Sequence, residues 1–321
     1  MAGDLDYLEV IREINIAIKT FEHFFEKGLN LIKVLCPLFV KTKTGLQDNL
    51  SGTEKAVTFL SNGENFEVVH SLAKWKREAL KRYKIPKGSG IYTNMKAIRK
   101  SETIDSLHSL LVDQWDWEKV ISKENRNIEY LKITVREIYK VIKDVSEYLR
   151  KFHGFTIPNL PPDIFFISSK DLEDIYPSLV PAEREENITK SKGAVFIMQI
   201  GGKLKSGIPH DLRSPDYDDW DLNGDLLLFN GLTDTVMEFS SMGIRVDKFS
   251  LKKQLVESGF HGSYSPYQEK ILNDELPYTI GGGIGQSRLL MFLLNKKHIA
   301  QVQASFWDNV TDKEIENLMP L

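Results

Sequence analysis

A run of glycines followed by a single arginine is the pattern in this chain that most suggests chemistry. Four glycines within 281–285 come just before Arg288, and an apolar segment follows at 286–295. Because glycine has no Cβ, a planar or phosphorylated ligand can approach the backbone closely there. A guanidinium can stack on a purine or bind a phosphate through two hydrogen bonds. The pattern therefore indicates a nucleotide site, although a strand-to-helix turn with Arg288 paired to a surface carboxylate would use the same residues.

Other motifs for nucleotide binding and hydrolysis are missing from the sequence. No GxxxxGK[ST] string occurs, and GIGQSR, which starts at Gly283, has arginine where a dinucleotide-binding fingerprint has its third glycine. No GxSxG elbow occurs, and the seven histidines show no HExxH spacing. These absences argue against a P-loop NTPase, a dinucleotide-dependent enzyme and a serine hydrolase.

Two carboxylates on a β-hairpin, predicted over the turn GLTD, form a candidate metal site. In the register that this turn favours, Leu227 lies opposite Glu238 and Asp225 lies opposite Ser240. Asp225 and Glu238 are then diagonal neighbours on one sheet face. Paired carboxylates need a cation or a proton between them, and oxygen ligands suit Mg²⁺. A slip of one residue would separate the two side chains, and each would then cap a turn or meet a surface lysine.

Further polar residues lie on predicted strands and at a helix start. Gln114 and Asp116 share one face of a strand and could bind a substrate ammonium group, while the preceding strand ends at Arg99, which suits a zwitterion or a phosphate. Three cations within 74–77 occupy the first turns of a helix, the unfavourable end for positive charge. Either an anion compensates them or water solvates them. The acidic and aromatic string DYDDW at 216–220 indicates a ligand loop or a surface loop.

The predicted elements alternate helices with strand pairs, which favours an α+β fold with a largely antiparallel sheet flanked by helices, in one domain over 1–321. Gly28 is the expected C-cap of the first helix, Ser71 the N-cap of the second, and Pro37 breaks the extended run Leu31–Val40. Residues Gly45–Gly52 read as a polar loop. The predicted helices are Tyr7–Lys27, Leu72–Tyr83, Asn127–Phe152, Pro181–Ser191, Leu251–Ser258, Pro266–Asn273 and Gln286–Asn295. The predicted strands are Phe66–Val69, Ile91–Arg99, Leu107–Trp117, Ile164–Ser168, Ala194–Ile200, Asp225–Asn230 and Thr235–Val246.

The bulk composition is typical of a globular enzyme of the cytoplasm. The chain has 321 residues, 41% of them hydrophobic and 27% charged, with a net charge of -3 that gives no overall signal for nucleic acid. Its one cysteine, Cys36, rules out an intrachain disulfide, suits a reducing compartment and is expected to be a small buried hydrophobe. No apolar signal core opens the chain, and its longest apolar run, 289–294, is too short to span a membrane.

Long strings distributed along the whole chain resemble asparagine synthetase A, the ammonia-dependent aspartate–ammonia ligase family. These strings are QDNLSGTEKAV, FEVVHSLAKWKRE, LHSLLVDQWDWE, GAVFIMQIGGKL, PDYDDW, LNGD, SSMGIRVD, TIGGGIGQSR and HIAQVQASFW. The resemblance implies the catalytic core of a class II aminoacyl-tRNA synthetase without its tRNA-reading parts, working as a homodimer. Pro37 then matches the first class II motif, and residues 7–40 hold a segment of the dimer interface. The chain departs from many family members after Trp220, where a longer insertion is absent.

The resemblance also implies roles for individual residues. Arg99 matches the arginine that holds the α-phosphate, and Arg288 matches the one against the adenine or γ-phosphate. Asp225 and Glu238 match the carboxylates that bind Mg²⁺ and ATP. Positions that line the aspartate pocket are matched by Ser71, Lys76, Gln114, Asp116 and Ser241, and further active-site positions by Asp48, Asp218 and Arg245.

The implied reaction uses L-aspartate, ammonia and ATP, with no nucleic-acid or membrane partner. Aspartate would be activated as a β-aspartyl adenylate with release of pyrophosphate, and ammonia would then displace AMP. We expect Asp48 to bind ammonium and take its proton. Cys36 is not placed as a glutaminase nucleophile, so ammonia is the expected nitrogen donor. The alternative is a synthetase paralogue that transfers an activated amino acid to RNA or protein.

Overall fold

The computed structural model describes residues 7–48, 50 and 54–307, and the predicted loop Gly45–Gly52 lies partly outside these ranges. Its main sheet has eight strands in the order β1-β5-β6-β11-β10-β9-β8-β7. Only β1–β5 and β7–β8 pair in parallel, so the predicted largely antiparallel sheet is confirmed. In that order the strands are Leu31–Lys33, Gly90–Ile98, Leu111–Val120, Thr279–Gly285, Thr235–Arg245, Asp218–Asn230, Ala194–Met198 and Phe165–Ser168.

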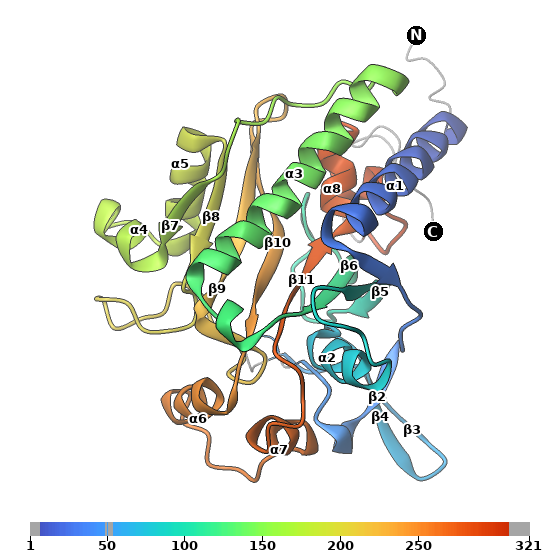
Figure 1. Ribbon diagram of the computed structural model, residues 1–321. Helices are drawn as coiled ribbons and strands as arrows, with labels where there is room; N and C mark the ends of the chain where they lie inside the picture. The colour runs from blue at the N-terminus through green and yellow to red at the C-terminus, as the bar shows by residue number, and fades with distance from the viewer. Residues whose placement is uncertain (1–6, 49, 51–53, 308–321) are drawn as a thin grey trace.

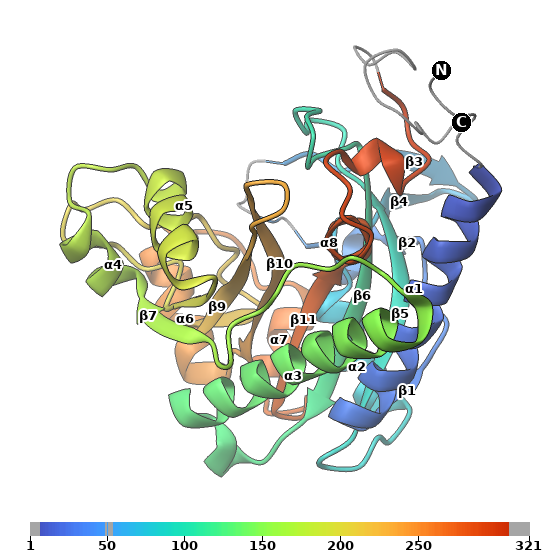
Figure 2. The ribbon, with the colours of Figure 1, turned by 90° about the horizontal axis from the view of Figure 1, so that it is seen from above.

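Helices cover both faces of this sheet (Figures 1 and 2). Two long helices, α1 and α3, cross one face, where Phe21 and Phe25 of α1 belong to the same core as Trp115 and Trp117 of β6. On the other face, α2, α6 and α7 pack over a second core. The helices are α1 (Tyr7–Leu29), α2 (Ala73–Arg82), α3 (Ile128–His153), α4 (Ser169–Ile175), α5 (Pro181–Lys192), α6 (Lys248–Glu257), α7 (Pro266–Leu272) and α8 (Gln286–Leu293). Among the described helices, none is long and apolar enough to cross a bilayer.

The end of α1 differs from the prediction. Gly28 does not cap the helix but lies inside it, and the left-handed residue that follows the helix is Asn30, with φ 59°. A Cβ on Gly28 would come within 2.5 Å of Val141 Cγ2 on α3. Gly28 is therefore needed for the close approach of the two long helices, because a larger side chain would separate them.

Several helix and strand boundaries also differ from the predicted ones. Leu72, not Ser71, is the N-cap of α2, and β6 begins four residues later than predicted, at Leu111. The strand β9 begins at Asp218, seven residues before the predicted start, so DYDDW spans a turn at Asp216 and Tyr217 and the first residues of the strand. Asp218 and Trp220 are buried in this strand. The chain after Trp220 thus continues as regular sheet without an insertion.

Pro37 separates two strands that join different sheets, as its missing N–H predicts. Before it, β1 joins the main sheet; after it, β2 (Phe39–Lys41) joins a small sheet with β4 (Glu64–Val68) and β3 (Thr58–Ser61). This small sheet projects from the body of the protein (Figure 1). Cys36 is half-buried rather than buried, and its thiol donates to the Asn94 carbonyl oxygen at 3.8 Å. Short 3₁₀ turns lie at Thr42–Thr44, Lys123–Asn125 and Ile299–Gln301 in the part of the chain that the structure describes.

Candidate active site

A cavity of about 610 Å³ lies on the sheet face opposite α1 and α3. Residues from β6, β10, β11, the start of β9 and the loop that follows β5 line it. Ten of the residues singled out from the sequence share this cavity: Asp48, Ser71, Arg99, Gln114, Asp116, Asp218, Glu238, Ser241, Arg245 and Arg288. The other two, Lys76 and Asp225, lie directly behind it in contact with lining residues. The fold therefore brings together groups that are up to 240 residues apart in the chain.

The glycines of β11 make room for neighbouring side chains. Gly281, Gly282 and Gly283 lie within the extended strand, whereas Gly285 ends it as the N-cap of α8, at the strand-to-helix junction. A Cβ on Gly281 would lie 2.1 Å from Glu118 Oε2, and one on Gly283 would lie 2.3 Å from Gln114 Oε1. Both carboxyl and amide groups come from β6, the neighbouring strand. The glycine run thus admits the polar side chains of β6 into the cavity wall, which the sequence pattern did not reveal.

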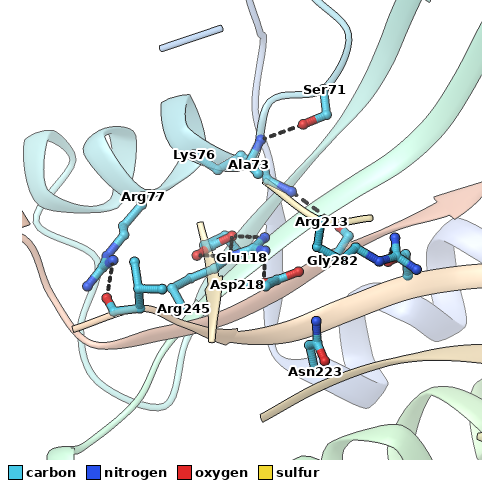
Figure 3. Close-up of polar contacts among 12 residues, drawn as sticks. Ser71, Ala73, Lys76, Arg77, Glu118, Arg213, Asp218, Asn223, Arg245 and Gly282 are labelled. Carbon is cyan, nitrogen blue, oxygen red and sulfur yellow. Dashed lines mark hydrogen bonds and ion pairs between the residues drawn. The ribbon is translucent and has the colours of Figure 1, made fainter. Parts of the chain in front are cut away.

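A buried ion-pair network forms one end of the cavity (Figure 3). Arg245 donates from Nε to both oxygens of Glu118 at 3.0 Å, and from Nη2 to Glu118 Oε2 at 2.6 Å. Its Nη1 donates to Asp218 at 2.5 Å. Burial opposes ionisation of Glu118, but the Arg245 guanidinium outweighs it and lowers the pKa of that carboxyl. The two carboxylates fix the plane of the guanidinium, so the orientation of Arg245 in the cavity wall is set by the protein.

The cations at the start of α2 are all buried, which contradicts simple solvation of these side chains. Lys74 pairs with Asp216 at 2.8 Å, and Lys76 pairs with Asp116 and donates to the Trp117 carbonyl oxygen at 2.9 Å. Burial lowers the pKa of Lys76 and raises that of Asp116, as expected for a pair removed from water. The anions that compensate these lysines are therefore the protein's own carboxylates.

Asp48 faces the cavity beside the start of α2. Its Oδ1 accepts from the Leu50 amide at 2.8 Å, and its Oδ2 accepts from the Ser71 hydroxyl at 2.5 Å. The neighbouring His70 places Nδ1 3.2 Å from the Asp48 carbonyl oxygen. Asp48 is 2% exposed. A buried carboxylate that accepts a hydrogen bond from a hydroxyl and also lines the cavity can bind a small cation.

The hairpin of β9 and β10 holds the two candidate metal ligands in a register close to the predicted one. Leu227 lies opposite Glu238, as predicted, but Asp225 lies opposite Ser241 instead of Ser240. The difference arises from a β-bulge between Glu238 and Ser240, which inserts one extra residue into β10. Both carboxylates still interact, since Glu238 is one of the groups that raise the pKa of Asp225.

Arg213 is a site residue that sequence reasoning missed. It reaches the cavity from the loop before β9, pairs with Asp225 and places Nη1 3.2 Å from Ser241 Oγ. Burial, followed by the charge of Glu238, raises the pKa of Asp225 to about 8 in spite of this arginine. Asp225 Oδ1 is buried and has no hydrogen-bond partner among the described residues. No spacing signal marks Arg213, because a loop positions it.

The two remaining arginines flank the other end of the cavity. The register of β5, β6, β10 and β11 places Arg99 and Arg288 near the start of β6, and Glu118 and Arg245 further along the sheet. Arg288 Nη1 donates to the Glu238 carbonyl oxygen at 3.1 Å. Arg99 Nε is buried without a hydrogen-bond partner in the part of the chain that the structure describes. These guanidiniums are positioned to bind an anion that enters the cavity.

Comparison of the sequence with known protein families identifies the family to which this chain belongs. A sequence model described as aspartate–ammonia ligase matches residues 9–319. The chain belongs to the aspartate–ammonia ligase family. It is 54% identical to an aspartate–ammonia ligase of Fusobacterium nucleatum over 92% of this chain and 93% of that protein. It is 52% identical to one of Lactiplantibacillus plantarum over 94% of this chain and 95% of that protein. The resemblance to this family is therefore confirmed.

Solved structures place this aspartate–ammonia ligase family member among class II synthetase folds. Asparaginyl-tRNA synthetase from Pyrococcus horikoshii, complexed with asparaginyl-adenylate, superposes with a TM-score of 0.65 over 92% of this chain and 68% of that chain, at 14% identity. The enzyme from Entamoeba histolytica superposes with a TM-score of 0.66 at 15% identity, over 92% of this chain and 67% of that chain. At such identities the likeness concerns the fold, and the predicted fold class is confirmed. A single domain over 1–321 stays a prediction.

Proposed function

We propose that this chain makes asparagine from L-aspartate, ammonia and ATP, in keeping with relatives that are named aspartate–ammonia ligases. The observation that carries the proposal is the shared cavity, with Arg99 and Arg288 at one end and Asp116 and Arg245 toward the other. Guanidiniums suit a triphosphate, whereas a carboxylate beside an arginine suits the ammonium and carboxylate of an amino acid. A side-chain carboxylate and an α-phosphate can therefore meet between the two ends.

The reaction has two steps in this proposal. An oxygen of the aspartate β-carboxylate attacks the α-phosphorus of ATP, and the bond to pyrophosphate breaks. Neutral ammonia then attacks the acyl carbon of the β-aspartyl adenylate, and AMP leaves with the former carboxylate oxygen. Activation is needed because oxide is a poor leaving group. Arg99 and Arg288 stabilise the charge that develops on the phosphate oxygens, in a cavity where water is partly excluded.

Asp48 is the proposed binding site for the nitrogen donor. Ammonium predominates in water near neutral pH, so the second step needs a group that accepts a proton. The Asp48 carboxylate lines the cavity, and one of its oxygens accepts a hydrogen bond from the Ser71 hydroxyl. It can attract ammonium by charge and take its proton as the nitrogen reaches the acyl carbon.

Asp225 and Glu238 are the proposed holders of Mg²⁺. The free, buried Oδ1 of Asp225 and the partly exposed Glu238 fit a cation that shares its coordination with phosphate oxygens. No three metal-binding side chains converge among the described residues, which agrees with a metal that keeps water and phosphate ligands. When bound, Mg²⁺ would neutralise charge on the triphosphate. Arg213 already pairs with Asp225, so it must then share or release this carboxylate.

Nucleotide products test the proposal most simply. The protein is incubated with aspartate, ATP, Mg²⁺ and ammonium, and the products are separated by anion-exchange chromatography. Stoichiometric AMP, pyrophosphate and asparagine are expected. ADP and phosphate would instead indicate an acyl-phosphate route, and no nucleotide product with any amino acid would remove the ligase proposal.

A homodimer in the cytoplasm completes the proposal. Exposed apolar side chains are concentrated around Pro37, where Leu35 is 92% exposed and Ile32, Leu38 and Phe39 are also largely exposed. The Phe39 ring packs on Phe59 of β3, which extends the apolar surface onto the small sheet. Such a surface suits a second copy of the chain. The single cysteine agrees with a reducing compartment.

A further inference from the structure

A chain of buried hydrogen bonds connects the carboxyl-terminal segment to both arginine-bearing elements. Gln303 donates from Nε2 to Ser287 Oγ at 2.9 Å, and Ser287 Oγ donates to Asp113 Oδ1 at 2.8 Å. On its other side, Gln303 Oε1 lies 2.5 Å from the Ser109 hydroxyl, which can donate to it. Ser109, Asp113, Ser287 and Gln303 are all buried, and all four line the cavity. The proposed reaction does not use any of them.

The direction of these bonds shows that an amide is needed at position 303. Gln303 Nε2 also donates to the Leu111 carbonyl oxygen at 3.0 Å, so one amide holds β6 and α8 together. Ser109 has one hydroxyl proton and two acceptors within reach, the Leu111 carbonyl oxygen at 2.6 Å and Gln303 Oε1. A flipped amide would set Oε1 against the Leu111 oxygen. The assignment with two Nε2 donors is therefore the consistent one.

The elements joined by Gln303 carry the arginines of the proposed phosphate site. Arg99 begins the loop 99–110, which contains Ser109, and the Arg99 amide donates to the Leu110 carbonyl oxygen at 2.9 Å. Arg288 directly follows Ser287 on α8. The loop has a second tie to the same segment, since the Ile299 amide donates to the Ser106 carbonyl oxygen at 2.9 Å.

We propose that Gln303 is a positioning residue that holds the loop 99–110 and helix α8 in a fixed relative position, so that Arg99 and Arg288 bind the same triphosphate. The inference rests on the proposed use of ATP. It assigns a function to a segment more than 180 residues away from the loop in sequence. Aspartate binding should be spared, because Lys76 of α2 holds Asp116, and Glu118, further along β6 than Leu111, holds Arg245.

The first test compares Gln303→Met with Gln268→Met. Gln268 is a matched control, since it is buried and donates to Asp216 Oδ2 at 2.9 Å, outside the cavity. Loss of the Gln303 bonds should raise the KM for ATP about tenfold and leave the KM for aspartate within about twofold. Gln268→Met should lower the Tm without changing either KM. Equal increases in both KM values for Gln303→Met, or an unchanged KM for ATP, would overturn the inference.

A second readout does not depend on catalysis. Trypsin can cleave after the exposed Lys100, and looser restraint of the loop should make cleavage about tenfold faster in Gln303→Met without any nucleotide. Ser109→Ala should act in the same direction if Gln303→Met folds poorly. Trypsin should cleave the double variant no faster than Gln303→Met, because both substitutions break the same hydrogen bond between Ser109 and Gln303. Unaltered cleavage in both single variants contradicts the inference, whereas a wild type that forms no AMP contradicts the proposed function instead.

Discussion

The contact between Gly281 and the buried ion pair allows a sharp prediction for one added methyl group. In Gly281→Ala the new Cβ would lie 2.1 Å from Glu118 Oε2 and 2.6 Å from Arg245 Nη2. Neither partner can move to water, since Glu118 is 0% exposed and Arg245 is 2% exposed. The methyl group must therefore break the pair or push the strands apart. Separating a buried ion pair costs about 3–5 kcal/mol, and overpacking alone costs about 1–3 kcal/mol.

We expect Gly281→Ala to lose about 3–5 kcal/mol of unfolding free energy, a large share of the roughly 5–15 kcal/mol typical of a domain. Urea unfolding followed by tryptophan fluorescence measures it. Gly202→Ala is the matched control, because no described atom beyond its chain neighbours lies within 4 Å of a Cβ there and its φ is not positive. Its change should stay within about 1 kcal/mol. If the two variants unfold at the same urea concentration, the tight packing described for Gly281 is wrong.

Three further outcomes follow from the site. The pKa of Asp225 is raised to about 8 in the fold, above that of an unfolded aspartate, so stability without metal should fall as the pH rises from about 4 to about 8. Mg²⁺ should release protons on binding at pH 7 and few at pH 9, which calorimetry in two buffers can measure; equal release at both pH values would contradict this. Asp48→Asn should still form adenylate, seen as pyrophosphate exchange, but should slow asparagine formation about 100-fold or more, and an unchanged rate would remove Asp48 from the second step. Leu35→Glu should shift sedimentation toward the monomer, whereas an unshifted dimer would place the interface elsewhere.

The sequence was most informative where a residue type is tied to local geometry. Strand alternation placed Gln114 and Asp116 on one face, and the cavity contains both. The hairpin register was correct up to Glu238, because turn length fixes the first pairs. It failed beyond the bulge, since no local signal marks an extra residue inside a strand. An arginine in a loop, Arg213, could not be found from spacing at all.

The roles of the glycines and of the α2 lysines depended on distant partners. Gly281 and Gly283 make room for side chains of β6, which the sequence did not indicate, while the close approach of a ligand to the glycines that line the cavity stays a prediction. Lys76 was expected in the aspartate pocket, yet it lies behind the wall on Asp116. Such packing depends on which strands become neighbours, and a single sequence does not specify this before the fold is known. Twelve residues chosen for their chemistry were nevertheless gathered in or behind one cavity.

In the proposed reaction, an oxygen of the side-chain carboxylate of aspartate becomes bonded to the α-phosphorus of ATP. Aspartate labelled with ¹⁸O in its β-carboxylate tests this directly, by mass spectrometry of the nucleotide formed in the presence of ammonium. One labelled oxygen in AMP for each asparagine is the predicted result. Unlabelled AMP, or label found only in inorganic phosphate, would contradict it.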